Sequence, residues 1–496
     1  MSLQARLFAT TRIEELRALG ARKILKRVLT GKDLVAIGLG SMIGGGIFTT
    51  IGPGIAKAGP AVIIAYVLAG AASFFAALCY AELGSMVPIA GSAYTYAYAT
   101  LGQLIAWIIG WDLILEYGIS AAPVAQQWSA FFQDGLQRLF GVSMPAWGAT
   151  AKYVYTGAWW HMDFAHSSYD VLGALFVLFL SAVLAIGVRE TATSNNAFVV
   201  VKIAALLVFI GAGLFLFHPQ NLQPFAPLGW VTGGRGGLGI IPAAALVFFS
   251  YIGFDAATTA AEECKNPQID IPVGVLGSLL IGTILYCAVA IVLLGAVQWQ
   301  HVDQNAALAV ALRPFHSATL EWIIVIGALA GTTSVALTSL FGQSRIFYVM
   351  ARDRMLPAFV AKIHPRFRTP ARMTMITGTV VALLTVIVPL DWLLELVNIG
   401  TFSAFIIVCA GVIFLRYRRP DLPRKFRSPF VPLFPILGIL LSAFLATQGL
   451  GKYTWWRFFG WLIVGLIIYF IYGFRKSDPK TINILEPEPE TLTYEA

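Results

Sequence analysis

Three consecutive glycines, Gly44, Gly45 and Gly46, lie in the middle of an apolar segment that is long enough to cross a bilayer as a helix. Glycine is a poor helix former. Because lipid offers no hydrogen-bond partner, non-helical backbone at membrane depth must be buried in protein or line a wet cavity. The glycines therefore predict a deliberate break whose free N–H and C=O groups bind a polar ligand. Alternatively, Gly40 and Gly44 form a GxxxG pair that only lets membrane helices approach closely.

A second break is expected in FFSYIGFDAATTAAEE, residues 248–263, where Gly253 and Asp255 lie in mid-segment. The two breaks fall in the first and sixth apolar segments, which is the same place in consecutive sets of five helices. This pattern is typical of an inverted repeat, in which two broken helices face each other at the membrane midplane and form a substrate site.

A pair of broken helices offers both groups that an amino acid zwitterion needs. The N–H groups that open the outer half of the first span suit a carboxylate, helped by the dipole at that helix N-terminus. The carbonyls that end the two inner halves suit an ammonium group. The predicted substrate-binding residues are Ser41, Met42, Ile43, Gly44, Gly45, Gly46, Ile47, Phe249, Ser250, Tyr251 and Gly253.

Several ionisable residues lie inside apolar segments. Lys202 is about seven residues, or roughly 10 Å, into the fifth span, so it either faces the helix bundle or snorkels to the cytoplasmic surface. Asp112 and Glu116 share one helical face of the third span. They either meet water or a partner near the outer vestibule, or Glu116 relays protons or binds a cationic side chain. Asp255 is expected to cap the inner half of the sixth span.

The composition is that of an integral membrane protein: 58% of the 496 residues are hydrophobic, 12% are charged and the mean hydropathy is +0.76. The apolar runs are continuous rather than alternating, which excludes a β-barrel and predicts an all-α fold. Twelve transmembrane helices are predicted near residues 34–58, 61–86, 93–126, 169–188, 196–217, 239–263, 273–298, 320–350, 371–390, 393–416, 431–450 and 455–474.

The distribution of basic residues predicts the orientation. Of the 34 lysines and arginines, 25 lie in segments on one side of the twelve spans and only seven on the other, so both termini are expected in the cytoplasm of a plasma-membrane protein. The expected organisation is a basic amphipathic segment on the membrane surface (1–33), two five-helix repeats (34–217 and 218–416), helices 11 and 12 (417–475) and a cytoplasmic tail (476–496).

Other classes of protein find little support in the sequence. The four cysteines have no CxxC or paired spacing, so neither a disulfide nor a metal site is expected. No HExxH, GxSxG or P-loop motif indicates catalysis, and no cofactor is implied. The chain has no basic soluble module for nucleic acid. An accessory membrane subunit is compatible with the sequence, although nothing in it indicates one.

Several long motifs in order resemble the amino acid-polyamine-organocation (APC) superfamily, and within it bacterial relatives of cationic amino acid transporters. The likeness runs from about residue 23 to 475 and includes GLGSMIGGGIF, YAELGSMVPIAGSAYTYAYATLG, GWDLILEYG, FFSYIGFDAATTAAEE and LVNIGTFSAFIIVCAGVIFLR. It implies the LeuT-type fold with broken helices 1 and 6, alternating access, and proton-coupled or exchange transport of amino acids. The family's usual GAG reads Gly44-Gly45-Gly46 here.

The resemblance also suggests residue roles. Lys202 stands where sodium-coupled relatives bind a cation, so its amine would carry protons. Its expected neighbours are the carbonyls of Gly38 and Leu39 and the hydroxyls of Thr333 and Ser334. Phe254 resembles the family's aromatic gate, although an aromatic residue in this place also suits simple packing.

The predicted function is import of L-amino acids by a secondary active, proton-coupled transporter. The pocket for the substrate side chain is expected between spans three, six and eight, where Leu337, Thr338 and Leu340 are apolar or neutral. Alanine-like neutral substrates are therefore at least as consistent as cationic ones. The alternatives are an amino acid exchanger without net proton flux and a sensor that binds an amino acid without transporting it.

Overall fold

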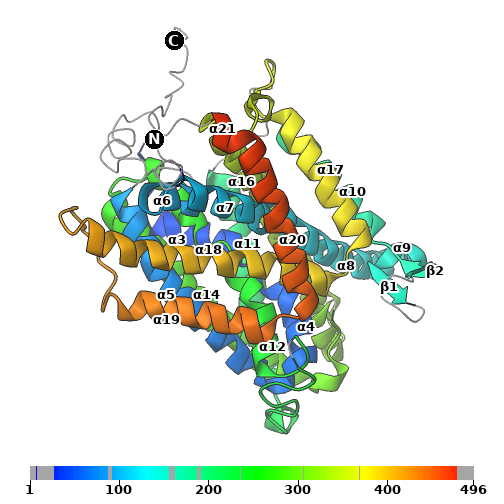
Figure 1. Ribbon diagram of the computed structural model, residues 1–496. Helices are drawn as coiled ribbons and strands as arrows, with labels where there is room; N and C mark the ends of the chain where they lie inside the picture. The colour runs from blue at the N-terminus through cyan, green and yellow to red at the C-terminus, as the bar shows by residue number, and fades with distance from the viewer. Residues whose placement is uncertain are drawn as a thin grey trace, which may run out of the picture.

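The computed structural model describes residue 7 and residues 27–87, 92–155, 162–186, 192–234, 236–304, 306–367 and 369–476. Most of the predicted N-terminal segment and nearly all of the predicted tail lie outside these residues. The described chain is a bundle of long helices with one two-stranded antiparallel ribbon at its edge (Figure 1).

The first half of the chain forms the helices of the predicted first repeat and the ribbon. Its elements are α3 (Gly31–Met42), α4 (Ile47–Ala58), α5 (Val62–Met86), α6 (Ser92–Thr100), α7 (Gln103–Leu113), the π-helix η2 (Ile114–Ile119), α8 (Ala121–Phe140), α9 (Ala146–Ala149), β1 (Lys152–Tyr155), β2 (Met162–Ser168), α10 (Val171–Ile186) and α11 (Ala192–Gly213).

The second half is also helical. Its main elements are α12 (Ile240–Val247), the 3-10 helix η5 (Phe248–Tyr251), α13 (Ala256–Thr259), η6 (Ala261–Glu263), α14 (Pro267–Ala296), α15 (Ala307–Ala311), α16 (Ala318–Arg352), α17 (Ala371–Ile387), α18 (Leu390–Arg418), α19 (Leu433–Phe444), the π-helix η10 (Leu445–Gly449), α20 (Lys452–Ile468), η11 (Tyr469–Gly473) and α21 (Phe474–Lys476).

Length and composition agree with a membrane protein. Among the described residues, eight helical stretches are long and apolar enough to cross a membrane, and one of them joins α4 to α5. Three shorter apolar helices, Val171–Ile186, Ala371–Ile387 and Leu433–Gly449, lie at the predicted fourth, ninth and eleventh spans. The prediction of an apolar, all-helical chain is confirmed at this level.

The predicted third span has the wrong bounds. Instead of one helix over 93–126, the chain forms the separate helix α6 and then a longer continuous helix from Gln103 to Phe140. The break lies at Gly102, whose φ of +100° is a backbone conformation that L-residues rarely adopt. In the sequence, Gly102 lies between two apolar runs, and a glycine in this position indicates a turn.

Polar residues in α8 find their hydrogen-bond partners inside the protein. Gln126 donates to Thr385 O (2.9 Å) and Val388 O (2.7 Å), and Ser129 donates to Asp170 (2.8 Å). These side chains are buried and satisfied by neighbouring segments. Their polarity therefore reflects contacts inside the protein, not exposure to water.

Helix α3 begins at two carboxylates. Thr30 N (2.8 Å) and Thr30 Oγ1 (2.7 Å) both donate to Asp33, and Gly31 N donates to Asp270 on α14 (2.9 Å). Carboxylates at a helix N-terminus satisfy its free amides and interact well with its dipole. Just before α3, Leu29 forms a bridge with Cys264, so the start of the first span is tied to the end of the second broken segment.

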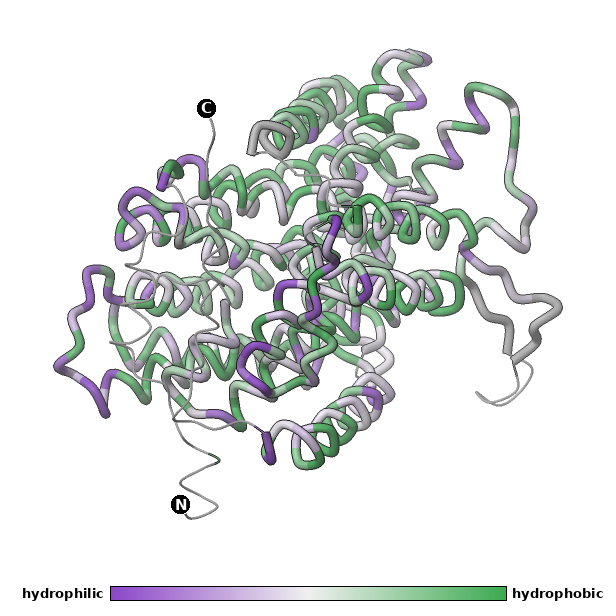
Figure 2. Tube along the Cα trace, turned by 90° about the horizontal axis from the view of Figure 1, so that it is seen from above, coloured by the Kyte–Doolittle hydropathy of each residue, from purple (hydrophilic) through white to green (hydrophobic). Residues whose placement is uncertain are grey.

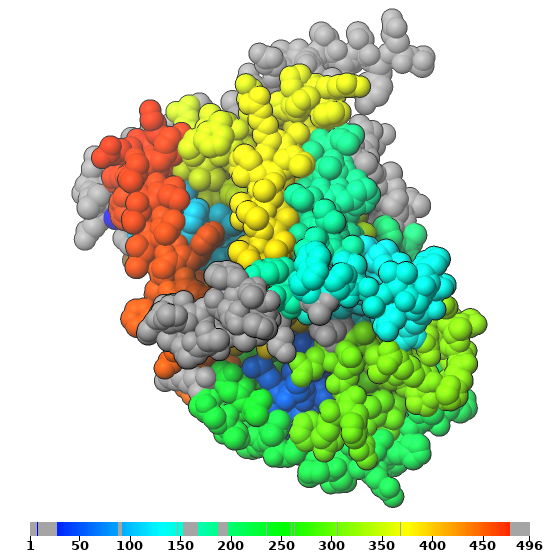
Figure 3. Space-filling model, turned by 90° about the vertical axis from the view of Figure 1, so that its right-hand side faces the viewer, coloured from blue at the N-terminus to red at the C-terminus, as the bar shows by residue number. Residues whose placement is uncertain are grey.

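The packing mixes the two halves of the chain. Helix α14 packs on α3 and α5, α11 packs on α16, and α10 packs along α17. Figure 3 shows α10 and α17 side by side on one face of the molecule, with α20 at its edge. Each of these pairs joins helices separated by at least a hundred residues, so the core is assembled across the predicted repeats.

A buried carboxylate ties the end of α5 to the connection between α18 and α19. Glu82 is 1% exposed and accepts two hydrogen bonds of 2.8 Å from Arg416. Arg424 lies 3.3 Å from the same carboxylate, and Ser428 N donates to it (2.8 Å).

Replacing Arg416 with glutamine is expected to destabilise the protein by about 2 kcal/mol or more, because removing one partner leaves a buried carboxylate poorly compensated. Thermal unfolding of the detergent-solubilised protein measures the effect. Arg372→Gln, an exposed arginine on the same predicted side, is the matched control. Equal melting temperatures for the two variants would show that Arg424 and Ser428 alone hold the carboxylate.

Candidate substrate site

The first predicted break is present. Residues 43–46 separate α3 from α4, and α4 begins without a side-chain cap. Among the described residues, the N–H groups of Gly44 and Gly45 take part in no backbone hydrogen bond. The start of α4 therefore presents unpaired amides and the positive end of a helix dipole.

Close backbone contacts explain two of the three glycines. Gly44 has a φ of +122°, and a Cβ there would lie 2.3 Å from the carbonyl oxygen of Gly331 on α16. A Cβ on Gly46 would lie 2.5 Å from Met42 O and 2.9 Å from the Cα of Ser250. Neither position has room for a side chain.

The second predicted break is present as well. Helix α12 tightens into η5, turns at residues 252–255 and resumes as the short helix α13. Gly253 makes the turn with a φ of +110°, and a Cβ there would lie 2.8 Å from the Cβ of Ser41. Because Gly253 touches Ser41 and Gly46 touches Ser250, the two breaks lie directly against each other.

A network of hydroxyl groups holds the breaks together. Thr50 on α4 is hydrogen-bonded to Ser250 (2.6 Å) and to Tyr66 on α5 (2.9 Å). Tyr251 donates to Tyr66 O (2.8 Å), and Tyr286 on α14 donates to Ser250 O (3.0 Å). All five residues are buried, so the network links α4, α5, η5 and α14 inside the protein.

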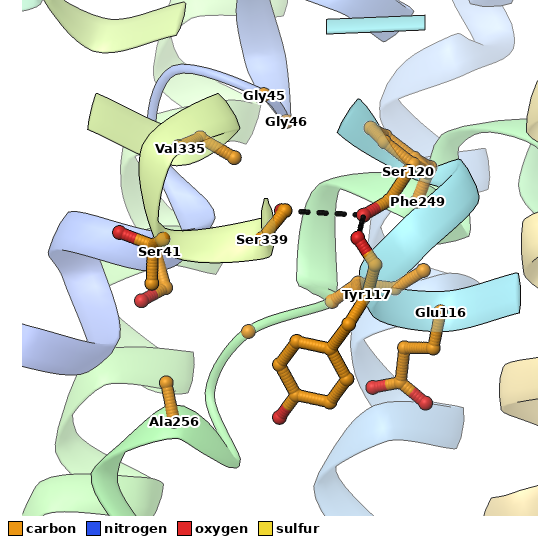
Figure 4. Close-up of a pocket in the computed structure, with 13 residues that line it drawn as sticks. Ser41, Gly45, Gly46, Glu116, Tyr117, Ser120, Phe249, Ala256, Val335 and Ser339 are labelled. Atoms are coloured by element: carbon orange, nitrogen blue, oxygen red, sulfur yellow. Dashed lines mark hydrogen bonds between the residues drawn. The ribbon is translucent and has the colours of Figure 1, made fainter. Parts of the chain in front are cut away.

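A small cavity lies between the breaks, η2, the start of α8 and α16 (Figure 4). Its wall combines hydroxyl groups, one carboxylate and apolar side chains. Ser120 donates to Ser339 (3.2 Å) across it. The lining residues are Ser41, Gly45, Gly46, Glu116, Tyr117, Ser120, Phe249, Ile252, Gly253, Ala256, Val335, Thr338 and Ser339.

Part of the predicted substrate set lies in this wall: Ser41, Gly45, Gly46, Phe249 and Gly253. The others are buried next to it without lining it. They are Met42, Ile43, Gly44, Ile47, Ser250, Tyr251, Phe254 and Leu340.

Three of the carbonyls expected to be free already have donors. Met42 O accepts from Gly46 N (3.0 Å), Phe249 O accepts from Ile252 N (3.2 Å), and Ser250 O accepts from Tyr286. The breaks are thus compact turns closed by their own hydrogen bonds. Each of these oxygens has only its second lone pair for a ligand.

Lys202 is fully buried at the first break. Its amine donates to Gly40 O, to Ile43 O (2.8 Å) and to the Ser334 hydroxyl (2.8 Å). It therefore does not snorkel to the surface. An ammonium group held by two carbonyls and a hydroxyl occupies an oxygen cage of the kind that binds Na⁺ or a proton in broken-helix transporters.

The cage lies slightly further along α3 than predicted. Leu39 O accepts from Ile43 N (2.8 Å), and Gly38 faces Ser278 on α14 rather than the amine. Thr333 is half-buried beside Ser334. The carbonyls that hold the amine are those at the end of the helix, because only there does the backbone turn away from helical pairing.

The two acidic residues of the third span are both buried, so neither is exposed to bulk water in this structure. Glu116 lies on the π-helix η2 and lines the cavity, next to Thr401 on α18. Asp112 does not line it. The wider π-helical turn carries Glu116 and Tyr117 together into the wall.

Asp255 stands at the predicted N-cap position of α13, but its side chain makes no capping hydrogen bond. Its carboxylate instead accepts from Tyr117 (2.7 Å) and from Ser92 on α6 (3.0 Å). The predicted capping role is therefore wrong. Asp255 fixes the Tyr117 side chain of the cavity wall and ties the second break to α6.

Phe254, expected either as a gate or as a packing residue, does not line the cavity. Its ring packs edge-on against Tyr80, with 5.5 Å between centroids, and against Phe405 at 5.4 Å. In this conformation it is a core residue, and Phe249 is the aromatic residue of η5 that lines the cavity.

Sequence reasoning missed six lining residues. Tyr117 and Ser120 follow Glu116 on the same helix, and Ile252 and Ala256 flank the second glycine break. The other two are on α16. A polar run next to Glu116 was a usable signal for the first pair, whereas only the packed structure identifies Val335 and Ser339.

Long apolar helices, two facing breaks and a cavity between them are the architecture of a secondary transporter rather than an enzyme. The sequence comparisons are consistent with that class. A family model described as amino acid permease matches residues 29–470, so the chain belongs to the amino acid permease family of the APC superfamily. The resemblance noted in the sequence is thereby confirmed.

Individual relatives differ in the solute that their names give. The chain is 42% identical over 482 residues to the branched-chain amino acid permease BcaP of Bacillus subtilis (strain 168), covering 96% of this chain and 99% of the relative. It is 41% identical over 474 residues to the methylthioribose transporter of the same organism (95% and 98%). It is 36% identical over 406 residues to the vacuolar cationic amino acid transporter 4 of Arabidopsis thaliana (80% and 64%).

Proposed function

We propose that this protein imports L-amino acids across the plasma membrane by alternating access, driven by a proton gradient. The observation that carries the proposal is the contact between the two glycine breaks, beside a cavity that both of them line. Broken helices that meet in this way bind substrates through their exposed backbone groups. The relatives named as amino acid transporters support the substrate class.

The proposed arrangement is the LeuT-type one: twelve spans, a 5+5 inverted repeat, and both termini in the cytoplasm. The position of the breaks supports it, because α3–α4 and α12–α13 begin the two sets of five helices. The excess of basic residues on one side supports the orientation. Helices α19 and α20 then lie outside the repeat.

In the proposed binding mode, backbone groups hold both ends of the amino acid. The carboxylate binds the free N–H groups of Gly44 and Gly45 at the start of α4. The ammonium group binds near Ser41 and the ends of α3 and η5, partly through the second lone pairs of carbonyls that already accept one hydrogen bond. Because these groups recognise only the common part of an amino acid, selectivity depends on the rest of the wall.

The rest of the wall favours neutral side chains. Ser120, Thr338 and Ser339 supply hydroxyls, while Phe249 and Val335 supply apolar surface. This combination suits alanine and the branched-chain amino acids. Glu116 is the one carboxylate in the wall among the described residues, so it decides whether cationic side chains are also accepted.

Replacing Glu116 with glutamine separates these cases, because glutamine keeps the size of the side chain and removes its charge. If Glu116 only relays protons, the variant loses proton-driven uptake of every substrate alike. If it binds a cationic side chain, lysine uptake falls by about tenfold or more while leucine uptake persists. Uptake of labelled leucine and lysine into proteoliposomes gives the ratio, with Asp134→Gln, an acidic residue away from the cavity, as control.

A second candidate substrate is methylthioribose, favoured by the similarity to a transporter of that solute and by the hydroxyl-lined wall. This solute has no carboxylate and no ammonium group. It would therefore leave the amides of Gly44 and Gly45 without an anionic partner, which is why the amino acid proposal fits the site better.

The deciding experiment is uptake of labelled alanine, leucine, lysine and methylthioribose into proteoliposomes, with and without an inward proton gradient. Accumulation of an amino acid in empty liposomes under the gradient is the expected result. Uptake that requires an amino acid inside the liposomes, whatever the gradient, would instead establish an exchanger. Binding without flux of any solute would indicate a sensor, and uptake of methylthioribose alone would refute the amino acid proposal.

A further inference from the structure

The connection between α18 and α19, residues 419–432, projects from the bundle as a hydrophilic loop at the left edge of Figures 1 and 2. Together with the last turn of α18 it carries six basic residues. The substrate site uses none of them. We propose that this loop and the end of α18 form a binding site for the headgroup of an anionic phospholipid.

Three of these basic side chains already form ion pairs with acidic residues of the protein. Arg416 and Arg424 bind the buried Glu82 carboxylate, and Arg419 is paired with Asp421 (3.1 Å). These contacts fix the path of the loop against α5. They also leave the loop with more arginines than carboxylates, even before its exposed residues are considered.

Three further cations are exposed: Arg418, Lys425 and Arg427. Within the described part of the chain, none of the three has an ion-pair partner. Arg427 is close enough to Arg424 for the two charges to repel. A bound anion would offset this repulsion.

Exposed apolar side chains flank these cations and indicate that the anion comes from a lipid. Tyr417 is 70% exposed, Phe430 is 72% exposed and Leu433 is 53% exposed. Aromatic rings beside basic residues at the end of an apolar helix are typical of the headgroup region of a membrane. Basic clusters that directly follow a membrane helix attract anionic lipids.

The backbone conformation at Phe430 supports the proposed contact with lipid. Phe430 has a φ of +47°, in the left-handed region that bulky residues rarely occupy. Its ring packs on Phe434 (5.2 Å between centroids), and Phe434 packs on Phe75 of α5. The structure thus holds an exposed aromatic side chain next to the cations, at a conformational cost.

The site is linked mechanically to α5. Ser428 N donates to Glu82, so the residue next to Arg427 is anchored on the buried carboxylate. A lipid bound to the exposed cations therefore reinforces the contact between this loop and α5. The inference concerns stability and lipid binding, and it holds whichever solute is transported.

The test is thermal unfolding of the full-length protein in a neutral detergent, titrated with dioctanoyl-phosphatidylglycerol. We expect a saturable rise in melting temperature, absent with dioctanoyl-phosphatidylcholine. The triple variant R418Q/K425Q/R427Q should weaken the apparent affinity by about tenfold to a hundredfold. A matched triple variant of other exposed basic residues, K362Q/R366Q/R372Q, should keep it. If the first triple variant does not fold, the double variant K425Q/R427Q replaces it.

Three outcomes would overturn the proposal. One is an unchanged affinity in the triple or double variant. Another is an equal response to inorganic phosphate at the same concentration, which would show a free-anion site. The third is a response that appears only after deletion of residues 477–496, which would show that the acidic tail of the chain itself covers the loop. Because the assay needs no transport, its result and that of the uptake experiment are independent.

Discussion

Replacing Lys202 with alanine is expected to abolish amino acid accumulation driven by a pH gradient. The amine is fully buried and donates to Gly40 O, Ile43 O and Ser334. No other described cation is held between the first break and α16 in this way, so the variant has nothing to carry the proton there. Removing the amine also leaves two carbonyls without their donor at the first break, which should loosen the segment that we propose binds the substrate carboxylate.

The measurement is uptake of a labelled amino acid into proteoliposomes at several external pH values. Ser334→Ala is the matched control, because it removes one of the hydrogen bonds to the amine but keeps the charge. It should slow uptake while preserving the pH dependence. A Lys202→Ala protein whose uptake still follows the pH gradient would place proton coupling elsewhere, with Glu116 as the next residue to examine.

Replacing Gly44 with alanine is expected to cause the second large effect, a loss of transport together with a destabilisation of about 2 kcal/mol or more. The added Cβ would lie 2.3 Å from Gly331 O, and the φ of +122° is unfavourable for any L-residue. The contact is with backbone, so no side chain can rotate to make room. Either α16 shifts or the break changes its shape.

Uptake and thermal unfolding are both measured for this variant. Gly460→Ala is the control: it lies in α20, and a Cβ there would meet nothing within 4 Å. Because alanine is the better helix former, this change should be neutral or stabilise by up to about 1 kcal/mol. Normal transport by Gly44→Ala would show that the shape of the first break is not needed for function.

The breaks could be predicted because their cause is local. A glycine is needed where the backbone adopts a positive φ or contacts another backbone closely. Such a glycine is easy to recognise in the sequence when the residues on both sides of it are apolar. Gly44 and Gly253 are such residues. The helices were predictable for a similar reason, since continuous apolar runs admit few other structures in a membrane.

The detailed site could not be predicted, because it depends on how distant helices pack. The partners of Lys202 were placed a few residues too early, since only the packed structure shows which carbonyls the amine reaches. Asp255 has the sequence signature of a cap, yet Tyr117 and Ser92 offer its carboxylate hydroxyl donors from two other helices. Phe254 and Phe249 are both aromatic, and the tight turns of η5 decide which of them reaches the cavity.

The third span shows a different limit. Polar residues near its end, including Gln126 and Ser129, suggest exposure to water when the sequence is considered alone. Their hydrogen-bond partners lie in other segments of the folded chain. In addition, a turn at Gly102 separates two helices that hydropathy predicts as one span. The two errors have different causes: hydropathy along the chain does not report which polar groups meet inside the folded protein, and it does not detect a turn at a single glycine.

The hydroxyl network around Ser250 has a consequence for motion. Thr50, Tyr66, Tyr251 and Tyr286 join four helical segments, two from each half of the chain, through hydrogen bonds that are buried. Displacing one of these segments alone would leave several polar groups without partners in the interior. We therefore expect the four segments to move together as one rigid body in the proposed transport cycle, and to slide against surfaces outside it, such as the backbone contact between Gly44 and Gly331 of α16.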